Sequence, residues 1–239
     1  MPKLQQPNVG SLEALLDQAK ASRPWFEAKV RAFATASGGV PGSVGLKADK
    51  QNQAKPSARA FQKAREKGAQ NKNPQGGYRY IKDMIRTSVS YANCGEVIKA
   101  LRDVQAHFFV VEAKDHFTQP KPGGYVDLNL IVENPQNGHL CELQIHFDNM
   151  LHSKHEGGHA AYRLERNATQ GARIRDMTDP KERARAMRAV WKGQSAYCQA
   201  RVDLHHDPKR GEMISAFKAL ESLARGNAAV YMKKLSVAV

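Results

Sequence analysis

Two stretches in the second half of the chain alternate between apolar and polar residues. In residues 125–133 the even positions are all apolar, and in residues 140–147 the odd positions are apolar from 141 onward. Such alternation places the apolar side chains of a strand on one face. Because only a short turn, residues 134–138, separates the two runs, the pattern predicts a β-hairpin with one face in the core.

Apolar residues elsewhere recur with the spacing of helices. Ser11 precedes a run with apolar residues on one face and predicts a helix start, and Pro24 predicts the first turn of a second helix. Residues 37–45 are rich in glycine and predict a linker. The other predicted elements are strands over residues 80–91 and 107–112, and helices over residues 58–67 (ending at Gly68), 95–105, 149–166, 179–202 and 212–225. This order predicts an α+β fold, a β-sheet flanked by helices.

Composition narrows the class of protein. The chain has 239 residues, of which 41% are hydrophobic, so it can build a core and extensive disorder is not expected. It contains neither a run of about 20 apolar residues nor a secretory leader pattern. Three widely spaced cysteines, Cys94, Cys141 and Cys198, are typical of a reducing compartment. We therefore expect a cytoplasmic protein without a membrane partner.

The positive charge is concentrated in one part of the chain. The formal net charge is +14, and residues 44–86 hold eleven basic and three acidic residues, a net of +8. Such a segment is either a solvated basic surface or an arm that binds phosphate groups. Charge alone favours a polyanionic partner without choosing among nucleotides, RNA, DNA and acidic membranes.

The second face of the predicted hairpin is polar but carries no lysine. Its members are Tyr125, Asp127, Asn129, Glu142, Gln144 and His146, with Asn129 expected opposite or near Glu142. A basic, glycine-rich loop with Lys121, Gly123 and Gly124 leads into it. This face is either exposed to solvent or part of a site for a phosphate-bearing ligand and a divalent ion.

A literal H-E-x-x-H motif, His155-Glu156-Gly157-Gly158-His159, raises zinc proteolysis as a remote alternative. Two glycines inside the motif disfavour the helix that this metal site needs. A convincing third ligand does not follow, so helix packing or surface histidines are the better interpretation.

Three motifs follow one another between residues 82 and 162. The first is Lys82-Asp83-Met84-Ile85-Arg86. The second is Lys114-Asp115-His116-Phe117, continued by Pro120-Lys121-Pro122-Gly123-Gly124-Tyr125. The third is Glu142-Leu143-Gln144-Ile145, followed by Met150 and residues 152–162, which include the histidine motif. Together they resemble the synthetase domain of the RelA/SpoT family of alarmone pyrophosphokinases, over residues 46–163.

The resemblance implies the family's nucleotidyltransferase-like synthetase fold, with a mixed β-sheet of about five strands flanked by helices, and three regions. These are an N-terminal helical extension and linker (1–45), a synthetase core (46–165), and a helical region packing on that core (166–239). The sequence departs from the family where "G-Y-R-S-L-H" reads Gly124-Tyr125-Val126-Asp127-Leu128-Asn129 and "Q-I-R-T" reads Gln144-Ile145-His146-Phe147. Two arginines and a histidine are lost, as in divergent toxin- or effector-like members.

The resemblance also implies roles for single residues. Asp83 and Glu142 would hold Mg²⁺, and Glu142 could activate the attacking hydroxyl, with Arg86 as the third catalytic residue. Further implied contacts are Lys47, Arg59, Lys63 and Arg86 with ATP, and Tyr125, Lys121, Asn129, Gln144 and His146 with the acceptor. In this interpretation Tyr125 stacks on the acceptor base.

The implied reaction is transfer of pyrophosphate from ATP to the 3′-OH of a guanine or adenine nucleotide. Transfer to the 3′ end of tRNA, in a toxin that acts in a target cell, is an alternative that extra basic charge favours. A degenerate synthetase that only binds nucleotide or RNA is another, because family arginines are missing. The sequence does not choose an acceptor or an oligomeric state.

Overall fold

A mixed β-sheet forms the centre of the molecule. The computed structural model describes residues 3–7, 9–42, 45–46, 58–72, 76–121, 124–153 and 177–237. The strands are β1 (Val40–Pro41), β2 (Gly45–Leu46), β3 (Ile85–Tyr91), β4 (Phe109–Asp115), β5 (Leu128–Glu133) and β6 (Leu140–Phe147). Their order is β1-β3-β6-β5-β4, and β2 also pairs with β3. Strands β3 and β6 are parallel and the other pairs are antiparallel.

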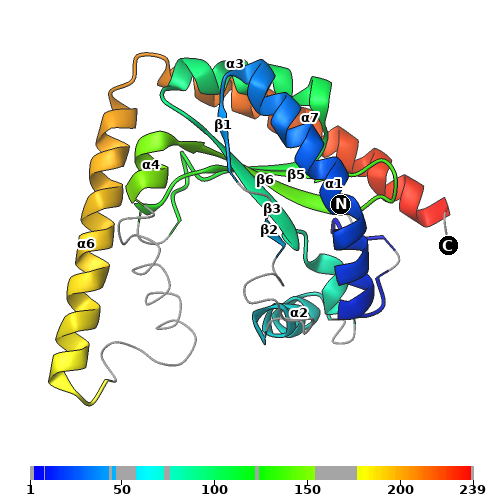
Figure 1. The fold of residues 1–239 in the computed structure, drawn as a ribbon, viewed down its shortest axis with the longest axis horizontal. Helices are drawn as coiled ribbons and strands as arrows, with labels where there is room; N and C mark the ends of the chain where they lie inside the picture. Colours follow the sequence, from blue (N-terminus) through cyan, green and yellow to red (C-terminus); the bar gives the residue numbers. More distant parts are fainter. Residues whose placement is uncertain are drawn as a thin grey trace.

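Helices cover the sheet on one side and border it on the other. They are α1 (Leu12–Ser37), α2 (Ala58–Gln70), the 3₁₀ helix η1 (Gly77–Tyr80), α3 (Cys94–His107), α4 (Asp148–Ser153), α6 (Pro180–His205) and α7 (Arg210–Val237). Helices α1, α3 and α7 lie over one face of the sheet (Figure 1). Helix α2 lies below β2 and β3, and helices α4 and α6 lie on the left of the same view. The predicted α+β class, with a mixed sheet flanked by helices, is confirmed.

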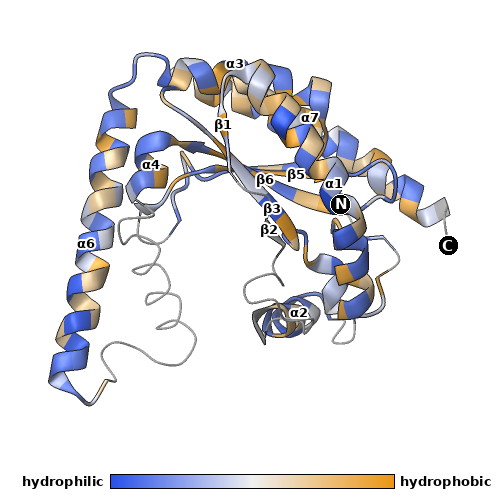
Figure 2. Ribbon diagram, viewed as in Figure 1, coloured by the Kyte–Doolittle hydropathy of each residue, from blue (hydrophilic) through white to orange (hydrophobic). Residues whose placement is uncertain are grey.

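The main core lies between the sheet and the helices on its covered face. Phe26 and Phe33 of α1 meet Phe108, which follows α3, with ring centroids 6.3 and 5.8 Å apart. The helices alternate between hydrophobic and hydrophilic stripes in Figure 2, as expected when one side faces a core. The odd positions of β6, from Cys141 to Phe147, are at most 1% exposed and belong to this core, which confirms the apolar face predicted for the hairpin.

The N-terminal helices predicted as two are one. Ser11 caps α1 through a hydrogen bond from the Ala14 N–H to its Oγ, 3.1 Å, but Pro24 lies inside the helix. Buried apolar residues continue on the same face past Pro24, and this packing outweighs the lost backbone hydrogen bond. Helix α2 likewise continues past Gly68 to Gln70.

Two stretches predicted as loop or strand differ in the structure. The linker predicted over residues 37–45 contains β1 and the start of β2, which add short antiparallel segments to β3. The strand predicted from residue 80 begins at Ile85, after η1.

The hairpin is confirmed, and Asn129 lies near Glu142 as expected, with a hydrogen bond between the two side chains. Strand β5 begins at Leu128, and Asn129 pairs with Gln144 while Ile131 pairs with Glu142. Residues 134–139 connect the two strands, and the Asn134 N–H bonds the His139 carbonyl oxygen, which fixes this register. In β4, a bulge between Val110 and Glu112 shifts the alternation.

The C-terminal helices follow the predicted caps. Asp179 accepts a hydrogen bond from the Lys181 N–H, 2.8 Å, and Pro180 opens α6, which confirms that start. Helix α7 is longer than predicted. The helix predicted over residues 149–166 begins as α4, and its part beyond Ser153 lies outside the described residues.

No helix within the described ranges is long and apolar enough to cross a membrane. The three cysteines are free thiols, with Cys94 and Cys141 buried and Cys198 exposed.

Candidate functional site

Strand pairing lines up polar residues across the face of the sheet opposite the main core. In one row, Arg86 of β3 pairs with Glu142 of β6, which pairs with Ile131 of β5. The bulge in β4 sets Glu112 opposite Ile131, at the end of this row. A second row, two residues further along, runs through Gln144, Asn129 and Lys114. The polar face predicted from the alternation is therefore real.

This face forms the floor of a cleft of about 710 Å³. Among the described residues its lining contains seven cationic and three acidic side chains, which gives the walls an excess of positive charge. The cations are Lys3, Lys63, Lys67, Lys82, Arg86, Lys114 and Lys121, and the acids are Asp83, Glu112 and Glu142. Such a surface suits a ligand with several negative charges.

The cleft brings together seven of the residues predicted to form the site. They are Lys63, Asp83, Arg86, Lys121, Asn129, Glu142 and Gln144, and they come from α2, β3, β5, β6 and two loops. Lys47 lies outside the described residues, as do His155, Glu156 and His159 of the histidine motif. Arg59 lies in the first turn of α2, but its side chain is outside the described part.

Asp83 and Glu142 are carboxylates that influence one another. Lys63 of α2 contacts Asp83, with Nζ 2.5 Å from Oδ1, and Asp83 is only 8% exposed. Burial and the negative charge of Asp83 raise the pKa of Glu142, while Arg86 and Lys63 partly oppose the rise. The pair is thus a concentration of negative charge at a place surrounded by cations.

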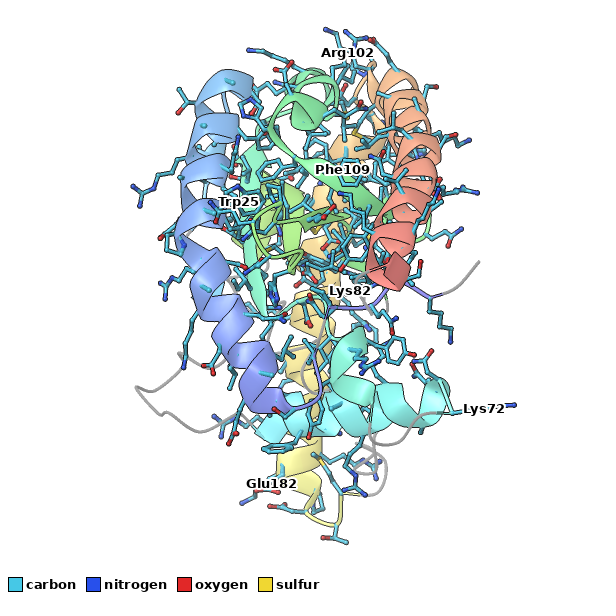
Figure 3. The ribbon with its side chains drawn as sticks, turned by 90° about the vertical axis from the view of Figure 1, so that its right-hand side faces the viewer. Trp25, Lys72, Lys82, Arg102, Phe109 and Glu182 are labelled. Carbon is cyan, nitrogen blue, oxygen red and sulfur yellow. The ribbon has the colours of Figure 1, made fainter. Side chains whose placement is uncertain are left out.

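A cluster of lysines borders this carboxylate pair. We call Lys63, Lys67, Lys82 and Lys114 the lysine cluster. Burial and repulsion from Lys63, Lys114 and Lys3 lower the pKa of Lys67. Lys82 lies between the sheet and α2 (Figure 3), and burial also lowers its pKa, although Glu112 opposes this. The positive charges of these lysines repel one another, and an anionic ligand would reduce that repulsion.

Glu112 connects two members of the cluster. Its carboxylate contacts both Lys82 and Lys114, and their charges lower the pKa of Glu112 against the opposing effect of burial. One carboxylate thus orients two ammonium groups without neutralising both. Lys67, Lys82, Lys114 and Glu112 were not predicted as site residues from the sequence. Lys67 lies one helical turn after Lys63, so the two share a face of the helix. Glu112 and Lys114 are two residues apart in a strand and share a face of the sheet. This spacing could have indicated Lys67, Glu112 and Lys114 as site residues.

Three polar side chains of β6 form a ladder along the face. Gln144 donates from Nε2 to Oε1 of Glu142, 2.7 Å, and its own Oε1 lies 3.2 Å from Nε2 of His146. The Tyr125 hydroxyl lies 3.0 Å from Nδ1 of His146. Tyr125 and His146 are buried and are not part of the cleft lining. Tyr125 instead packs edge-on against Tyr197 of α6, with centroids 5.5 Å apart, and its stacking on a base stays a prediction.

The loop before β5 carries a second charged group in the cleft wall. Asp127 is fully buried, with Oδ1 2.6 Å from Nδ1 of His116 and 2.8 Å from Nζ of Lys121. Burial would raise the pKa of Asp127, but the hydrogen bond with His116 and the charge of Lys121 hold it well below its usual range. Both partners line the cleft.

The part of the chain that the structure describes contains no group of three or more His, Cys, Asp or Glu side chains arranged for a metal. A metal at Asp83 and Glu142 would therefore take no third ligand of these types from the described residues. Mg²⁺ binds in this way, through one or two carboxylates, waters and substrate phosphates. The donor set of the cleft fits that ion.

Comparison with solved structures returns alarmone synthetases. Small alarmone synthetase 1 from Bacillus subtilis, bound to its product pppGpp, is 16% identical, with a TM-score of 0.48 over 83% of this chain and 94% of that chain. A GTP pyrophosphokinase family protein from Streptococcus pneumoniae is 17% identical, with a TM-score of 0.43 over 87% and 97%. No protein-family model and no curated protein matches the chain. Identities this low do not transfer a function, so the assignment rests on the residues of the cleft.

Proposed function

We propose that this protein transfers the β,γ-pyrophosphate of ATP to a hydroxyl of a nucleotide, most simply the 3′-OH of a guanine nucleotide. The observation that carries the proposal is the carboxylate pair Asp83 and Glu142 beside the lysine cluster in one cleft. A triphosphate needs several cations, and phosphoryl-type transfer needs a place where developing negative charge is stabilised. The order of the three sequence motifs supports the same reaction.

The lysine cluster and Arg86 would bind the triphosphate of ATP. Lys63 contacts Asp83 and therefore stands between the donor phosphates and the carboxylate pair. Arg86 pairs through its strand with Glu142, so its charge acts at the same place. These groups would draw negative charge away from the β-phosphorus and hold it in line with the acceptor.

In the proposed step the acceptor hydroxyl oxygen forms a bond to the β-phosphorus of ATP. The bond between that phosphorus and the oxygen bridging to the α-phosphate breaks, and AMP leaves. The hydroxyl proton passes to the Glu142 carboxylate. Gln144 holds that carboxylate through its 2.7 Å hydrogen bond.

Asp83 and Glu142 are the residues that would hold Mg²⁺. Bound there, the ion would supply neutralising charge for the phosphate oxygens. The negative charge of Asp83 contributes, after burial, to the raised pKa of Glu142, and this repulsion between the two carboxylates supports a cation between them.

On the acceptor side, Asn129 and Gln144 offer amide groups on the cleft floor, and Lys121 offers a cation. Tyr125 and His146 lie behind this wall and are joined by the 3.0 Å hydrogen bond. For Tyr125 to stack on a base, the loop that carries it would have to move when the acceptor binds.

The experiment incubates the protein with γ-labelled ATP and Mg²⁺ and, separately, GDP, GTP, ATP or tRNA. The proposal predicts labelled product with a guanine nucleotide and release of one AMP for each pyrophosphate transferred. Label on tRNA alone would replace the nucleotide acceptor with RNA. No labelled product with any acceptor would refute the enzymatic proposal, and nucleotide binding by the same protein would then favour a degenerate synthetase that only binds its ligands.

A further inference from the structure

Asp127 has an unusual position for an acidic residue. Its side chain is fully buried, yet both of its oxygens are engaged, and both partners reach into the cleft wall. Lys121 spans Oδ1 and Oδ2 at 2.8 and 2.9 Å, and His116 contacts Oδ1 at 2.6 Å. A buried carboxylate is costly unless such partners compensate it, so the arrangement fixes Lys121 and His116 relative to one another.

This group lies at a distance from the carboxylate pair. Asp127 precedes Leu128, which pairs with Ile145, and therefore stands level with His146 of β6. His146 is four residues along the strand from Glu142, a distance of about 13 Å at the rise of a β-strand. The backbone N–H of His116 bonds the Asp127 carbonyl oxygen, 3.1 Å, which keeps His116 at the same level. The cleft thus has two cationic ends, with the carboxylate pair nearer the lysine cluster.

The chemistry of this second end favours an anion. Among the described residues, the hydrogen bond to Asp127 engages Nδ1 of His116, so Nε2 is the ring atom available to a ligand. A protonated ring would donate Nδ1–H to Asp127 and Nε2–H to the ligand at the same time. The Lys121 ammonium has three N–H donors, two of which meet Asp127. Both groups can therefore donate to one phosphate.

We propose that His116, oriented by Asp127, binds a phosphate group of the acceptor together with Lys121. This inference rests on the proposed function, because it takes the lysine cluster as the donor end of the cleft. Asp127 is then a positioning residue, and His116 a specificity-determining residue that selects phosphorylated acceptors over free nucleosides. Val126 and Asn129 stand where the resembling family has arginine and histidine, and His116 would supply one hydrogen-bond donor in their place.

The test measures equilibrium binding of GDP and of guanosine, with a non-hydrolysable ATP analogue saturating the donor end. ADP and adenosine form a second pair. The proposal predicts that the wild-type protein prefers each diphosphate to its nucleoside. In His116→Gln this preference falls about tenfold, the effect of losing one hydrogen bond between charged groups, while guanosine binding is unchanged.

His206→Gln, at an exposed position of another surface, is the matched control and should keep the full preference. Asp127→Asn should lower the same preference by displacing His116 and Lys121. Because Asp127 is buried and this variant is expected to lose stability, His116→Gln decides the matter.

The inference is overturned if wild-type protein binds the diphosphates no tighter than the nucleosides, or if His116→Gln keeps the wild-type preference. Neither result depends on turnover. Absence of labelled product from wild-type protein in the transfer assay would instead count against the proposed function. The two failures are therefore distinguishable.

Discussion

Replacing Lys67 by glutamine separates ligand binding from stability. In the free protein Lys67 is partly buried and is repelled by Lys63, Lys114 and Lys3, so its charge is disfavoured. With the triphosphate of ATP in the cleft, the same charge would make a favourable contact. A hydrogen bond between charged groups contributes about 1.5–3 kcal/mol, which is roughly 10- to 150-fold in affinity.

We therefore expect Lys67→Gln to weaken binding of a non-hydrolysable ATP analogue at least about tenfold. Its free energy of unfolding should change by less than about 0.5 kcal/mol, because the side chain contributes to no core. Arg65→Gln is the matched control, since Arg65 is an exposed cation on the same helix outside the cleft lining.

The measurements are titration calorimetry with the analogue and urea unfolding of each variant. Equal loss of affinity in both variants would mean that α2 acts only through its overall charge. Unchanged affinity in Lys67→Gln, with Mg²⁺ present, would refute the assignment of the lysine cluster to the donor phosphates.

Two further predictions concern the frame of the site. Burial lowers the pKa of His139 to about 4 from 6.5, so the unfolded chain binds the extra proton between these values and stability falls as the pH is lowered through them. The pKa difference of about 2.5 units corresponds to a loss of about 3 kcal/mol in the free energy of unfolding on acidification. Urea unfolding at several pH values should show this loss in the wild-type protein and not in His139→Leu. An equal loss of stability at low pH in both proteins would contradict this prediction. In Gly77→Ala, the new Cβ would clash with the backbone carbonyl oxygen of Ala64 in α2. We expect a loss of about 1–3 kcal/mol in the free energy of unfolding, and weaker binding of the ATP analogue because α2 is displaced. Gly211→Ala, with open space around its Cβ, should change neither, and a wild-type melting temperature for Gly77→Ala would show that the contact between η1 and α2 is less tight than described.

Local sequence patterns predicted most of the strands and helices that position the site. The alternation in residues 125–133 and 140–147 predicted the hairpin, and with it the shared polar face of Glu142, Gln144 and Asn129. The spacing of apolar residues predicted most helices, and cap residues such as Asp179 predicted where they begin. Asp83, Lys63 and Arg86 line one cleft, and the roles that the resemblance implies for them stay predictions.

Features that depend on tertiary contacts were not visible in the sequence. The parallel pairing of β3 with β6, which sets Arg86 beside Glu142, joins segments more than fifty residues apart. Lys3 reaches the cleft because Gln6 ties the N-terminal segment to the sheet, with hydrogen bonds to the backbone of Ile81 and Leu140. No local pattern encodes either contact.

Packing also decided which polar residues line the cleft and which support it. Tyr125 and His146 were predicted as acceptor contacts, but Tyr197 of α6 packs on Tyr125 and the pair lies behind the wall. Asp127 was predicted only as part of the polar face, and its contact with His116 depends on the fold of the loop between them. The division of the chain at residues 45 and 165 stays a prediction.

The most direct test of the central claim compares Glu142→Gln with the wild-type protein in the transfer assay. The substitution keeps the shape of the side chain and its contact with Gln144 while removing the carboxylate. We predict that pyrophosphate transfer to the guanine nucleotide falls at least about a hundredfold, within the usual contribution of a proton-accepting residue, while the ATP analogue still binds. Glu221→Gln, at a distant position on α7, should retain full activity. Transfer by Glu142→Gln at the wild-type rate would contradict the account.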